Sequence, residues 1–333
     1  MILRACEKEI IQSLNKKKIV HIPGPRQVGK TVLVQKIGNE SGLKTFWLNG
    51  DDADTAAIFE NATSTRLRLL FGNYELLIID EAQRITNIGL TLKIIIDNIP
   101  NLKVLVTGSS AFELSDKINE PLTGRKIEIF LFPLSFAEMV NHTNLIEEKR
   151  LLEYRMIYGS YPEVITNPGD EKSVLKRLSD AYLYKDLLNF EKLKKSSVIV
   201  KLLQALALQL GNEVSYNEIG QIIGIDNQTV ERYVDLLEKA YIIFRLQSFN
   251  RNIRTELKKS RKIYFYDNGI RNSLIANFNS LALRQDTGAL WENYIISERR
   301  KYLSYNNIWA NCYFWRTHAQ QEIDYIEERE GIL

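Results

Sequence analysis

Residues 24–31 read Gly24-Pro25-Arg26-Gln27-Val28-Gly29-Lys30-Thr31, and this stretch decides the fold of the chain around it. It fits the pattern G-x-x-x-x-G-K-[ST], in which glycines let successive backbone N–H groups turn toward an anion. The preceding residues 19–22 predict a strand, and a helix is predicted to start near Lys30. Because a helix N-terminus attracts phosphate, we expect all eight residues to bind a nucleotide, with Lys30 at the β- and γ-phosphates and Thr31 at Mg²⁺.

Residues 1–135 alternate between short apolar runs and polar or amphipathic segments. Each intervening segment is long enough for a crossover helix, and this alternation predicts a parallel sheet with helices on both faces. We therefore expect an α/β fold of the P-loop NTPase type in this part of the chain. The five predicted strands are residues 18–22, 44–48, 75–79, 103–107 and 126–131.

Two of these strands end in side chains that suit the same site. Asp80 and Glu81 follow an apolar run, and ligands bind at the carboxyl ends of such strands. Asp80 is expected to hold Mg²⁺ or its water ligands, and Glu81 to orient and polarise the attacking water. Thr107 and Ser109 end the next strand with hydroxyl groups that could contact the γ-phosphate or that water. A purely structural turn explains these two hydroxyl groups almost equally well.

The sequence also favours one nucleotide over another and hydrolysis over phosphoryl transfer to an alcohol. No Asn-Lys-x-Asp sequence, which reads guanine, occurs in the chain, so ATP is favoured over GTP. Arg125, just before the fifth predicted strand, could offset charge on the transferring phosphoryl group, although most arginines are simply solvated. A small-molecule kinase would share the loop. Glu81 after the strand aspartate suits activation of water better than transfer to an alcohol.

The composition gives no indication of a disordered, collagen-like or disulfide-rich protein. The 333 residues exceed the size of one hydrophobic core, and 45% apolar and 26% charged residues are ordinary globular values. A net charge of +3 is too small to indicate nucleic-acid binding by itself. Cys6 and Cys312 predict neither a disulfide framework nor a zinc site, and no membrane-spanning or secretion segment is evident. We expect a cytoplasmic bacterial or archaeal protein.

After about residue 135 the alternation stops and helical spacing predominates. A capping-box pattern from Ser215 to Glu218 opens a helix-turn-helix, in which Val230, Val234 and Leu237 are expected to face the core. The predicted helices are 147–158, 171–190, 197–210, 215–223, 227–240 and 288–303, and the predicted strands are 241–249, 262–266, 308–315 and 322–326.

Nucleic-acid contact through this half is an open hypothesis. The outward side chains of the second helix of the helix-turn-helix are not basic, so they support major-groove binding weakly. A basic run lies where a wing or hairpin is expected and could grip phosphates without reading sequence, but a solvated hairpin explains it at least as well. The run contains Arg251, Arg254, Lys258, Lys259, Arg261 and Lys262.

With these elements assembled, the chain resembles a prokaryotic family of AAA-type ATPases related to the signal-transducing STAND group. Members of this family join an ATPase module to a C-terminal nuclease-like domain. The resemblance covers nearly the whole chain. It rests on Gly24 to Thr31, Ile79-Asp80-Glu81-Ala82-Gln83, Thr107-Gly108-Ser109-Ser110, Leu122-Thr123-Gly124-Arg125, and Phe132-Pro133-Leu134-Ser135-Phe136 with Glu138.

The resemblance implies roles that the residues alone do not establish. Arg125 would be an arginine finger, and hydrolysis would require an oligomer if it acts on a neighbouring subunit. The sheet order would place the Asp80 and Thr107 strands beside the loop strand, with Glu81 facing the γ-phosphate. A winged-helix module, used in such proteins for DNA or for protein contacts, would follow the helical segment.

The last segment of the chain is similar to the first part of a restriction-endonuclease-like fold. Glu292 and Asp324 match the helical glutamate and strand aspartate that bind metal in active members. The chain reaches Leu333 without the acid-x-Lys that completes such a site, so we do not expect nuclease activity from it. Truncation and a structural remnant both explain this.

The sequence therefore predicts an Mg²⁺-dependent ATPase whose nucleotide state controls the C-terminal half, for which DNA contact stays an open hypothesis. The alternative is a nucleotide-dependent switch or scaffold for a protein partner, with little turnover and no DNA binding. The predicted modules are an ATPase domain at 1–135, a helical module at 136–210, a winged-helix-like domain at 211–270 and a partial nuclease-like domain at 271–333.

Overall fold

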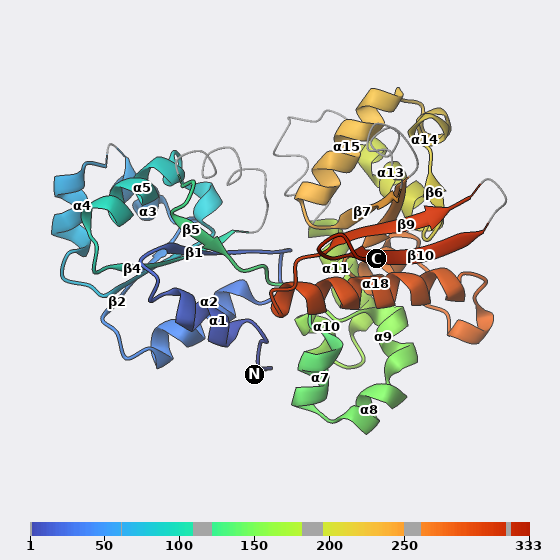
Figure 1. Ribbon diagram of the computed structural model, residues 1–333, viewed down its shortest axis with the longest axis horizontal. Coiled ribbons are helices and arrows are strands. Elements are labelled where there is room, and N and C mark those ends of the chain that lie inside the picture. The colour runs from blue at the N-terminus through green and yellow to red at the C-terminus, as the bar shows by residue number, and fades with distance from the viewer. Residues whose placement is uncertain (1, 61, 109–121, 182–195, 250–260, 318–320) are drawn as a thin grey trace. The chain divides into compact units, whose positions relative to one another are not determined.

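The computed structural model of the chain describes residues 2–60, 62–108, 122–181, 196–249, 261–317 and 321–333. These residues form two compact units, unit 1 (Met1–Phe132) and unit 2 (Pro133–Leu333) (Figure 1). The predicted module boundaries near residues 210 and 270 fall inside unit 2 and remain predictions.

Unit 1 is built on a five-stranded sheet with the order β2-β3-β4-β1-β5, in which every pairing is parallel. The predicted parallel α/β fold is confirmed, and each observed strand overlaps one of the five apolar runs. The strands are β1 (Ile19–Pro23), β2 (Thr45–Asn49), β3 (Leu76–Asp80), β4 (Lys103–Gly108) and β5 (Lys126–Glu128).

The strand order corrects one expectation. β4, which carries Thr107, pairs directly with the loop strand β1, but β3, which carries Asp80, lies one strand further away. Local sequence pattern shows where strands occur but not which strands pair, because the pairing depends on how the crossover helices pack. Asp80 nevertheless reaches the loop side of the sheet, because all these strands end at the same edge.

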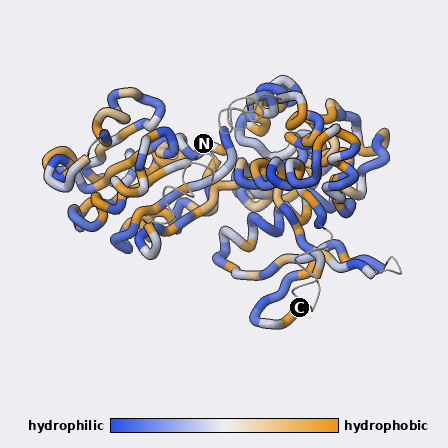
Figure 2. The backbone as a smooth tube through the Cα atoms, turned by 90° about the horizontal axis from the view of Figure 1, so that it is seen from above, coloured by the Kyte–Doolittle hydropathy of each residue, from blue (hydrophilic) through white to orange (hydrophobic). Residues whose placement is uncertain are grey.

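The core of unit 1 explains why its central strands are mostly apolar. Every residue of β1 and β3 is buried, as expected for parallel strands covered on both faces. Figure 1 shows α1 and α2 on one face of the sheet and α3, α4 and α5 on the other, and Figure 2 colours the backbone by hydropathy, with apolar residues in orange. The helices are α1 (Glu7–Ser13), α2 (Lys30–Glu40), α3 (Ala53–Phe59), α4 (Ser64–Phe71), the 3-10 helix η1 (Ala82–Arg84) and α5 (Ile88–Asn98).

Unit 2 contains a second sheet with the order β10-β9-β7-β8-β6. The β7–β9 pairing is parallel and the other pairings are antiparallel. Strands from the predicted winged-helix-like and nuclease-like segments therefore share one sheet. They are β6 (Glu213–Val214), β7 (Ile243–Ser248), β8 (Arg261–Phe265), β9 (Asn311–Arg316) and β10 (Glu322–Glu328).

Helices make up most of the rest of unit 2. The helix expected at 147–158 is two helices, because the backbone leaves the helical path at Leu151 and a buried ion pair from Glu148 to Arg155, at 2.9 Å, packs one helix on the other. Residues 182–190 of the expected helix 171–190 lie outside the described residues. The helices are α7 (Phe136–His142), α8 (Leu145–Arg150), α9 (Leu152–Tyr158), α10 (Pro162–Thr166), α11 (Glu171–Ala181), α13 (Ser196–Leu208), α14 (Tyr216–Ile223), α15 (Asn227–Lys239), α17 (Asn268–Leu274), the 3-10 helix η3 (Leu281–Leu283) and α18 (Thr287–Tyr305).

The helix pair α14 and α15 forms where the sequence predicts it. The Ser215 side chain accepts a hydrogen bond from the backbone of Glu218, which satisfies one free N–H at the start of α14. On α15, Val230, Val234 and Leu237 are fully buried at the expected helical spacing. The local periodicity and capping signals are therefore sufficient to place these two helices.

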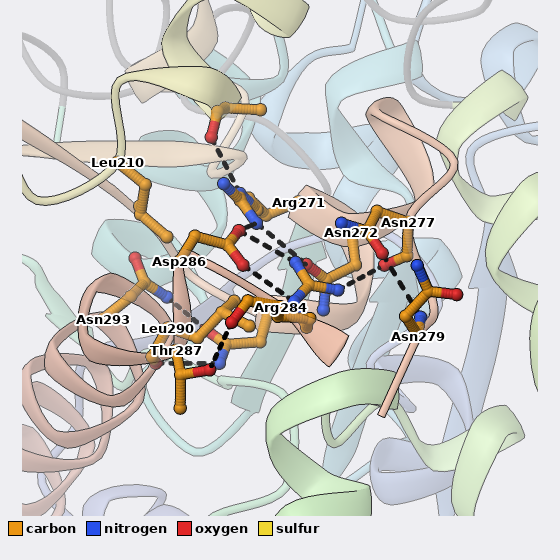
Figure 3. A network of polar contacts seen from close by, with 12 residues as sticks. Leu210, Arg271, Asn272, Asn277, Asn279, Arg284, Asp286, Thr287, Leu290 and Asn293 are labelled. Carbon is orange, nitrogen blue, oxygen red and sulfur yellow. Dashed lines mark hydrogen bonds and ion pairs between the residues drawn. The ribbon is translucent and has the colours of Figure 1, made fainter. Parts of the chain in front are cut away.

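A buried polar network joins α17 to the start of α18 (Figure 3). The Asp286 carboxylate accepts hydrogen bonds from two guanidinium groups, at 2.5 Å from Arg271 and 2.8 Å from Arg284. Both arginines also donate to the side-chain oxygen of Asn272, and Arg271 donates to the Ala207 carbonyl at the end of α13. These buried cations therefore depend on one carboxylate for neutralisation.

We expect Asp286→Asn to lower the free energy of unfolding by about 3 kcal/mol, because it leaves two buried guanidinium groups without a counter-charge. Burial opposes ionisation, but the hydrogen bonds of Arg284 and Arg271 lower the pKa of Asp286 from 3.8 to about 2. The carboxylate therefore stabilises the fold fully above pH 3.8, and this contribution is lost as the pH falls toward 2. Urea unfolding at pH 7 and pH 3 measures both effects. Asp180→Asn, at an exposed position in α11, is the control, and equal stability of the two variants would contradict the prediction.

Candidate functional site

The loop that is predicted to bind phosphate, residues 24–31, follows β1, which ends at Pro23, and runs into α2, which begins at Lys30. A side chain at Gly24 would place its Cβ only 2.2 Å from the Leu131 carbonyl oxygen, so this position requires glycine. Gly29 stands at the N-cap of α2 with φ of +93°, a left-handed conformation that favours glycine. The two glycines of the motif therefore meet different constraints, one of space and one of backbone conformation.

Lys30 directs its ammonium group back onto the loop. Its side chain is buried, and Nζ donates hydrogen bonds to the carbonyl oxygens of Gly24, at 2.9 Å, and Pro25, at 2.6 Å. A buried ammonium needs such partners, since an unpaired one costs several kcal/mol. The positive charge consequently lies beside the loop backbone, as a contact with bound phosphate requires.

Asp80 is the point at which three elements of the site meet. Its Oδ2 accepts a hydrogen bond from Thr31 Oγ1 of α2, at 2.7 Å, and its Oδ1 accepts one from the Thr107 hydroxyl of β4. Asp80 is 4% exposed and Thr107 is fully buried. Asp80 therefore contacts both of the other side chains that the sequence analysis chose from separate segments.

This donor set suits Mg²⁺ bound together with a phosphate. A threonine hydroxyl and a carboxylate are hard oxygen ligands, and Mg²⁺ at nucleotide sites is held by one or two protein groups plus phosphate and water. Among the described residues there is no cluster of three or more His, Cys, Asp or Glu side chains that could hold a metal ion alone. Thr31 and Asp80 would hold the ion together with the phosphates of a bound nucleotide.

Glu81 occupies a constrained position next to this cluster. Its φ is +49°, and its backbone N–H donates to the Thr107 hydroxyl at 3.0 Å. A Cβ at Gly50 would approach the Glu81 carbonyl oxygen to 2.2 Å, so Gly50 makes room for this turn. The Glu81 carboxylate accepts a hydrogen bond from Gln83 Nε2. Thr107 therefore fixes both acidic residues, and Gln83 restrains the carboxylate expected to activate water.

Sequence reasoning missed Arg4. Its buried guanidinium donates to the carbonyl oxygens of Val28, inside the loop, and Phe132, each at 2.6 Å. No spacing or motif connects an isolated arginine near the N-terminus to a loop more than twenty residues away. The sequence also gave no role to Gln83 or Gly50, because each acts through a contact with Glu81.

Arg125 lies away from the loop. The pairing of Ile19 with Lys126 places it at the amino-terminal edge of the sheet, whereas the loop follows Pro23 at the carboxyl edge, roughly 13 Å further along β1. Its Nε forms an ion pair with Asp97 at 2.9 Å. This position gives no support to action on the site of its own subunit, and a role on a neighbouring subunit remains a proposal. Ser109 lies outside the described residues.

In unit 2, Glu292 and Asp324 do come together, but around a lysine. Lys262 Nζ is bonded to Glu292 at 3.1 Å, to Asp324 at 2.9 Å and to Glu322 at 2.5 Å. Burial alone would lower the pKa of Lys262, but the hydrogen bonds that its ammonium group donates to these carboxylates hold the pKa above its usual value. The Lys262 ammonium group therefore lies among these three carboxylates and offsets their negative charge.

This cluster corrects the interpretation of the basic run. Lys262 is 1% exposed, so it cannot present its charge to a DNA phosphate as expected. Arg261 lies over the Tyr216 ring, 4.2 Å from its centre, and pairs with Glu231 at 3.5 Å. Both residues thus have structural partners within unit 2. The other four members, Arg251, Arg254, Lys258 and Lys259, lie outside the described residues.

Comparison with known protein families agrees with the architecture of unit 1. Residues 16–140 match the family described as an AAA domain. Residues 149–281 match a domain of unknown function, DUF8612, and residues 287–333 match another, DUF4143. Across the described residues, no helix is both long and apolar enough to cross a bilayer.

Related proteins and solved structures extend this likeness. An uncharacterized protein of Mycobacterium tuberculosis is 26% identical over 325 residues, which cover 96% of this chain and 70% of the relative. One from Methanocaldococcus jannaschii is 26% identical over 335 residues, covering 94% and 72% of the two chains. A Walker-type ATPase of Pyrococcus abyssi, 17% identical, superposes with a TM-score of 0.55 over 83% of this chain and 96% of its own. Unit 1 thus has the fold of an AAA-type P-loop ATPase, which supports nucleotide binding.

We expect Thr107→Val to lower the free energy of unfolding by about 1–3 kcal/mol, because Asp80 Oδ1 and the Glu81 N–H both lose the hydroxyl group to which they are bonded. Thr91→Val is a matched control, since Thr91 is also buried but makes only a 3.4 Å contact with a backbone carbonyl. Urea unfolding of both variants measures the difference. A Thr107→Val protein as stable as the Thr91→Val protein would show that the hydroxyl does not hold the site together.

Proposed function

We propose that unit 1 binds ATP with Mg²⁺ at the loop and hydrolyses it, and that nucleotide state controls unit 2. The observation that carries the proposal is the joining of Thr31, Asp80 and Thr107 by hydrogen bonds beside the loop. Phosphoryl transfer needs positioned charge more than covalent chemistry, and this arrangement would hold a metal ligand next to the loop that we expect to bind phosphate.

The residues of the site would divide the work as follows. The loop N–H groups and Lys30 would bind the β- and γ-phosphates, while Thr31 and Asp80 would hold Mg²⁺, which neutralises charge on the phosphates when bound. Glu81 would accept a proton from the attacking water, and it lies next to Asp80 in the same turn. Thr107 would keep both acids in position through its two hydrogen bonds.

Lys30→Ala is expected to reduce ATP turnover by about 100-fold or more, because it removes the positive charge at the phosphates. Glu81→Gln is expected to reduce turnover by about 100-fold to 10,000-fold while leaving binding intact, because a general base is lost but no phosphate contact. Phosphate release and equilibrium binding of ATP measure the two effects. Lys8→Ala and Glu60→Gln, both at exposed positions of unit 1, are the controls. Undiminished hydrolysis in both site variants would contradict the proposal.

The contact between Gln83 and Glu81 favours a second candidate, a nucleotide-dependent switch with little turnover. The hydrogen bond that Gln83 donates holds the Glu81 carboxylate in one orientation, so Glu81 would have to leave Gln83 before it could activate water. The same assay separates the two candidates. Tight, Lys30-dependent binding with wild-type turnover no faster than that of Glu81→Gln would support the switch.

DNA contact through unit 2, the further hypothesis from the sequence, depends on the four basic residues Arg251, Arg254, Lys258 and Lys259. If they grip phosphates, the affinity for duplex DNA will fall steeply with salt, with a slope of about −0.9 for each phosphate neutralised. Replacing Arg251 and Arg254 with alanine should make that slope shallower. Replacing Lys176 and Lys201, at exposed positions on α11 and α13, should not change it. No affinity at low salt would instead favour a protein partner.

A further inference from the structure

Arg4 joins two segments of unit 1 that are far apart in the sequence. One η nitrogen donates to the Val28 carbonyl and the other to the Phe132 carbonyl, both at 2.6 Å, and the side chain is 9% exposed. A planar guanidinium can donate to two acceptors in fixed directions, whereas a lysine offers a single point charge. Arg4 thus clamps the loop to the last residue of unit 1.

The contact at Val28 bears on the phosphate-binding face of the loop. The Val28 carbonyl and the Gly29 N–H belong to one peptide group, and in a planar trans peptide they point in opposite directions. By holding the carbonyl, Arg4 fixes the direction of the Gly29 N–H. Since a loop of this kind binds phosphate through such N–H groups, Arg4 influences the site without touching the nucleotide.

The first residue of the loop also contacts the exit segment, which we define as residues 131 and 132, where the chain leaves unit 1. The Leu131 N–H donates to the Pro23 carbonyl at 2.9 Å, and the space beside Gly24 is filled by the Leu131 carbonyl. Residues 131 and 132 therefore contact the loop at both of its ends, directly at Gly24 and through Arg4 at Val28. A change in loop conformation on nucleotide binding would displace this segment.

Within unit 2, the residues that follow are fastened to α18. Lys301 is 2% exposed and donates to the Leu134 carbonyl at 2.9 Å, and the Phe136 N–H donates to the Glu298 carboxylate at 2.8 Å. Lys301 also pairs with Glu298 at 2.7 Å, so these contacts form one network. Displacement of residues 133–136 would therefore act directly on the helix that carries Glu292.

We propose that Arg4 is a positioning residue that couples nucleotide occupancy of the loop to unit 2 through Phe132 and the segment bound to α18. The proposal rests on ATP binding at the loop. Arg4 orients the loop peptide at Val28 and holds the exit segment, so the two move together. Without the guanidinium, the loop still binds nucleotide and Leu131 still contacts Gly24, but movement at Val28 no longer reaches Phe132 and the residues that follow it.

Amide hydrogen exchange of the full chain tests this coupling, with and without Mg²⁺ and a saturating non-hydrolysable ATP analogue. In the wild type we expect the analogue to change exchange in peptides covering 133–136 and 296–303. Arg4→Gln should bind the analogue about tenfold more weakly, through loss of a charged hydrogen bond, and should lose the change in unit 2 even at saturation. Arg4→Lys should show an intermediate change. Arg68→Gln is the matched control, because Arg68 is exposed and donates to the Asn98 carbonyl away from the loop.

The outcomes separate this inference from the proposed function. A wild-type chain that binds the analogue without any change at 133–136 would overturn the coupling and leave ATP binding standing. An Arg4→Gln or Arg4→Lys protein that is saturated and responds as the wild type does would also overturn it. A wild-type chain that binds no analogue would overturn both. Loss of the response in Arg4→Gln with a normal response in Arg68→Gln would support the coupling.

Discussion

The carboxylate of Asp80 holds the candidate site together, because it accepts hydrogen bonds from hydroxyl groups on two other elements. Thr31 belongs to α2, Thr107 to β4 and Asp80 itself to the end of β3. These contacts fix the helix that follows the phosphate-type loop against the carboxyl edge of the sheet. The placement of Glu81 follows from the same arrangement, since its N–H also bonds to the Thr107 hydroxyl.

Close packing of the backbone also stabilises this arrangement. Gly24 and Gly50 are each packed so closely against another backbone carbonyl that a side chain would not fit. Arg4 adds a charged contact to the loop carbonyl of Val28. Three features therefore restrain the loop: its glycine residues, the close contact of Gly24 with Leu131, and the hydrogen bond from Arg4 to Val28. Pre-organised N–H groups lower the cost of ordering the loop around an anion.

Much of unit 1 could be predicted from the sequence, because its signals are local. Apolar runs located the five strands, and the glycine and lysine spacing located the loop and α2. The order of the strands could not be predicted in the same way, and β4 separates the Asp80 strand from the loop strand. The role of Arg4 and the burial of Lys262 depend on contacts between distant segments, which no local pattern records. Arg125 shows the converse, since a suitable residue type in a suitable motif lies at the opposite edge of the sheet from the loop.

The central claim is that the loop and the Asp80 cluster form one nucleotide site. A crystal structure of the full chain with Mg²⁺ and a non-hydrolysable ATP analogue tests it most directly. We expect the terminal phosphates at the loop, Lys30 Nζ turned from the Gly24 and Pro25 carbonyls to the phosphates, and Mg²⁺ within reach of Thr31 and Asp80. An analogue bound elsewhere, or Lys30 still bonded to the loop carbonyls beside it, would contradict this claim.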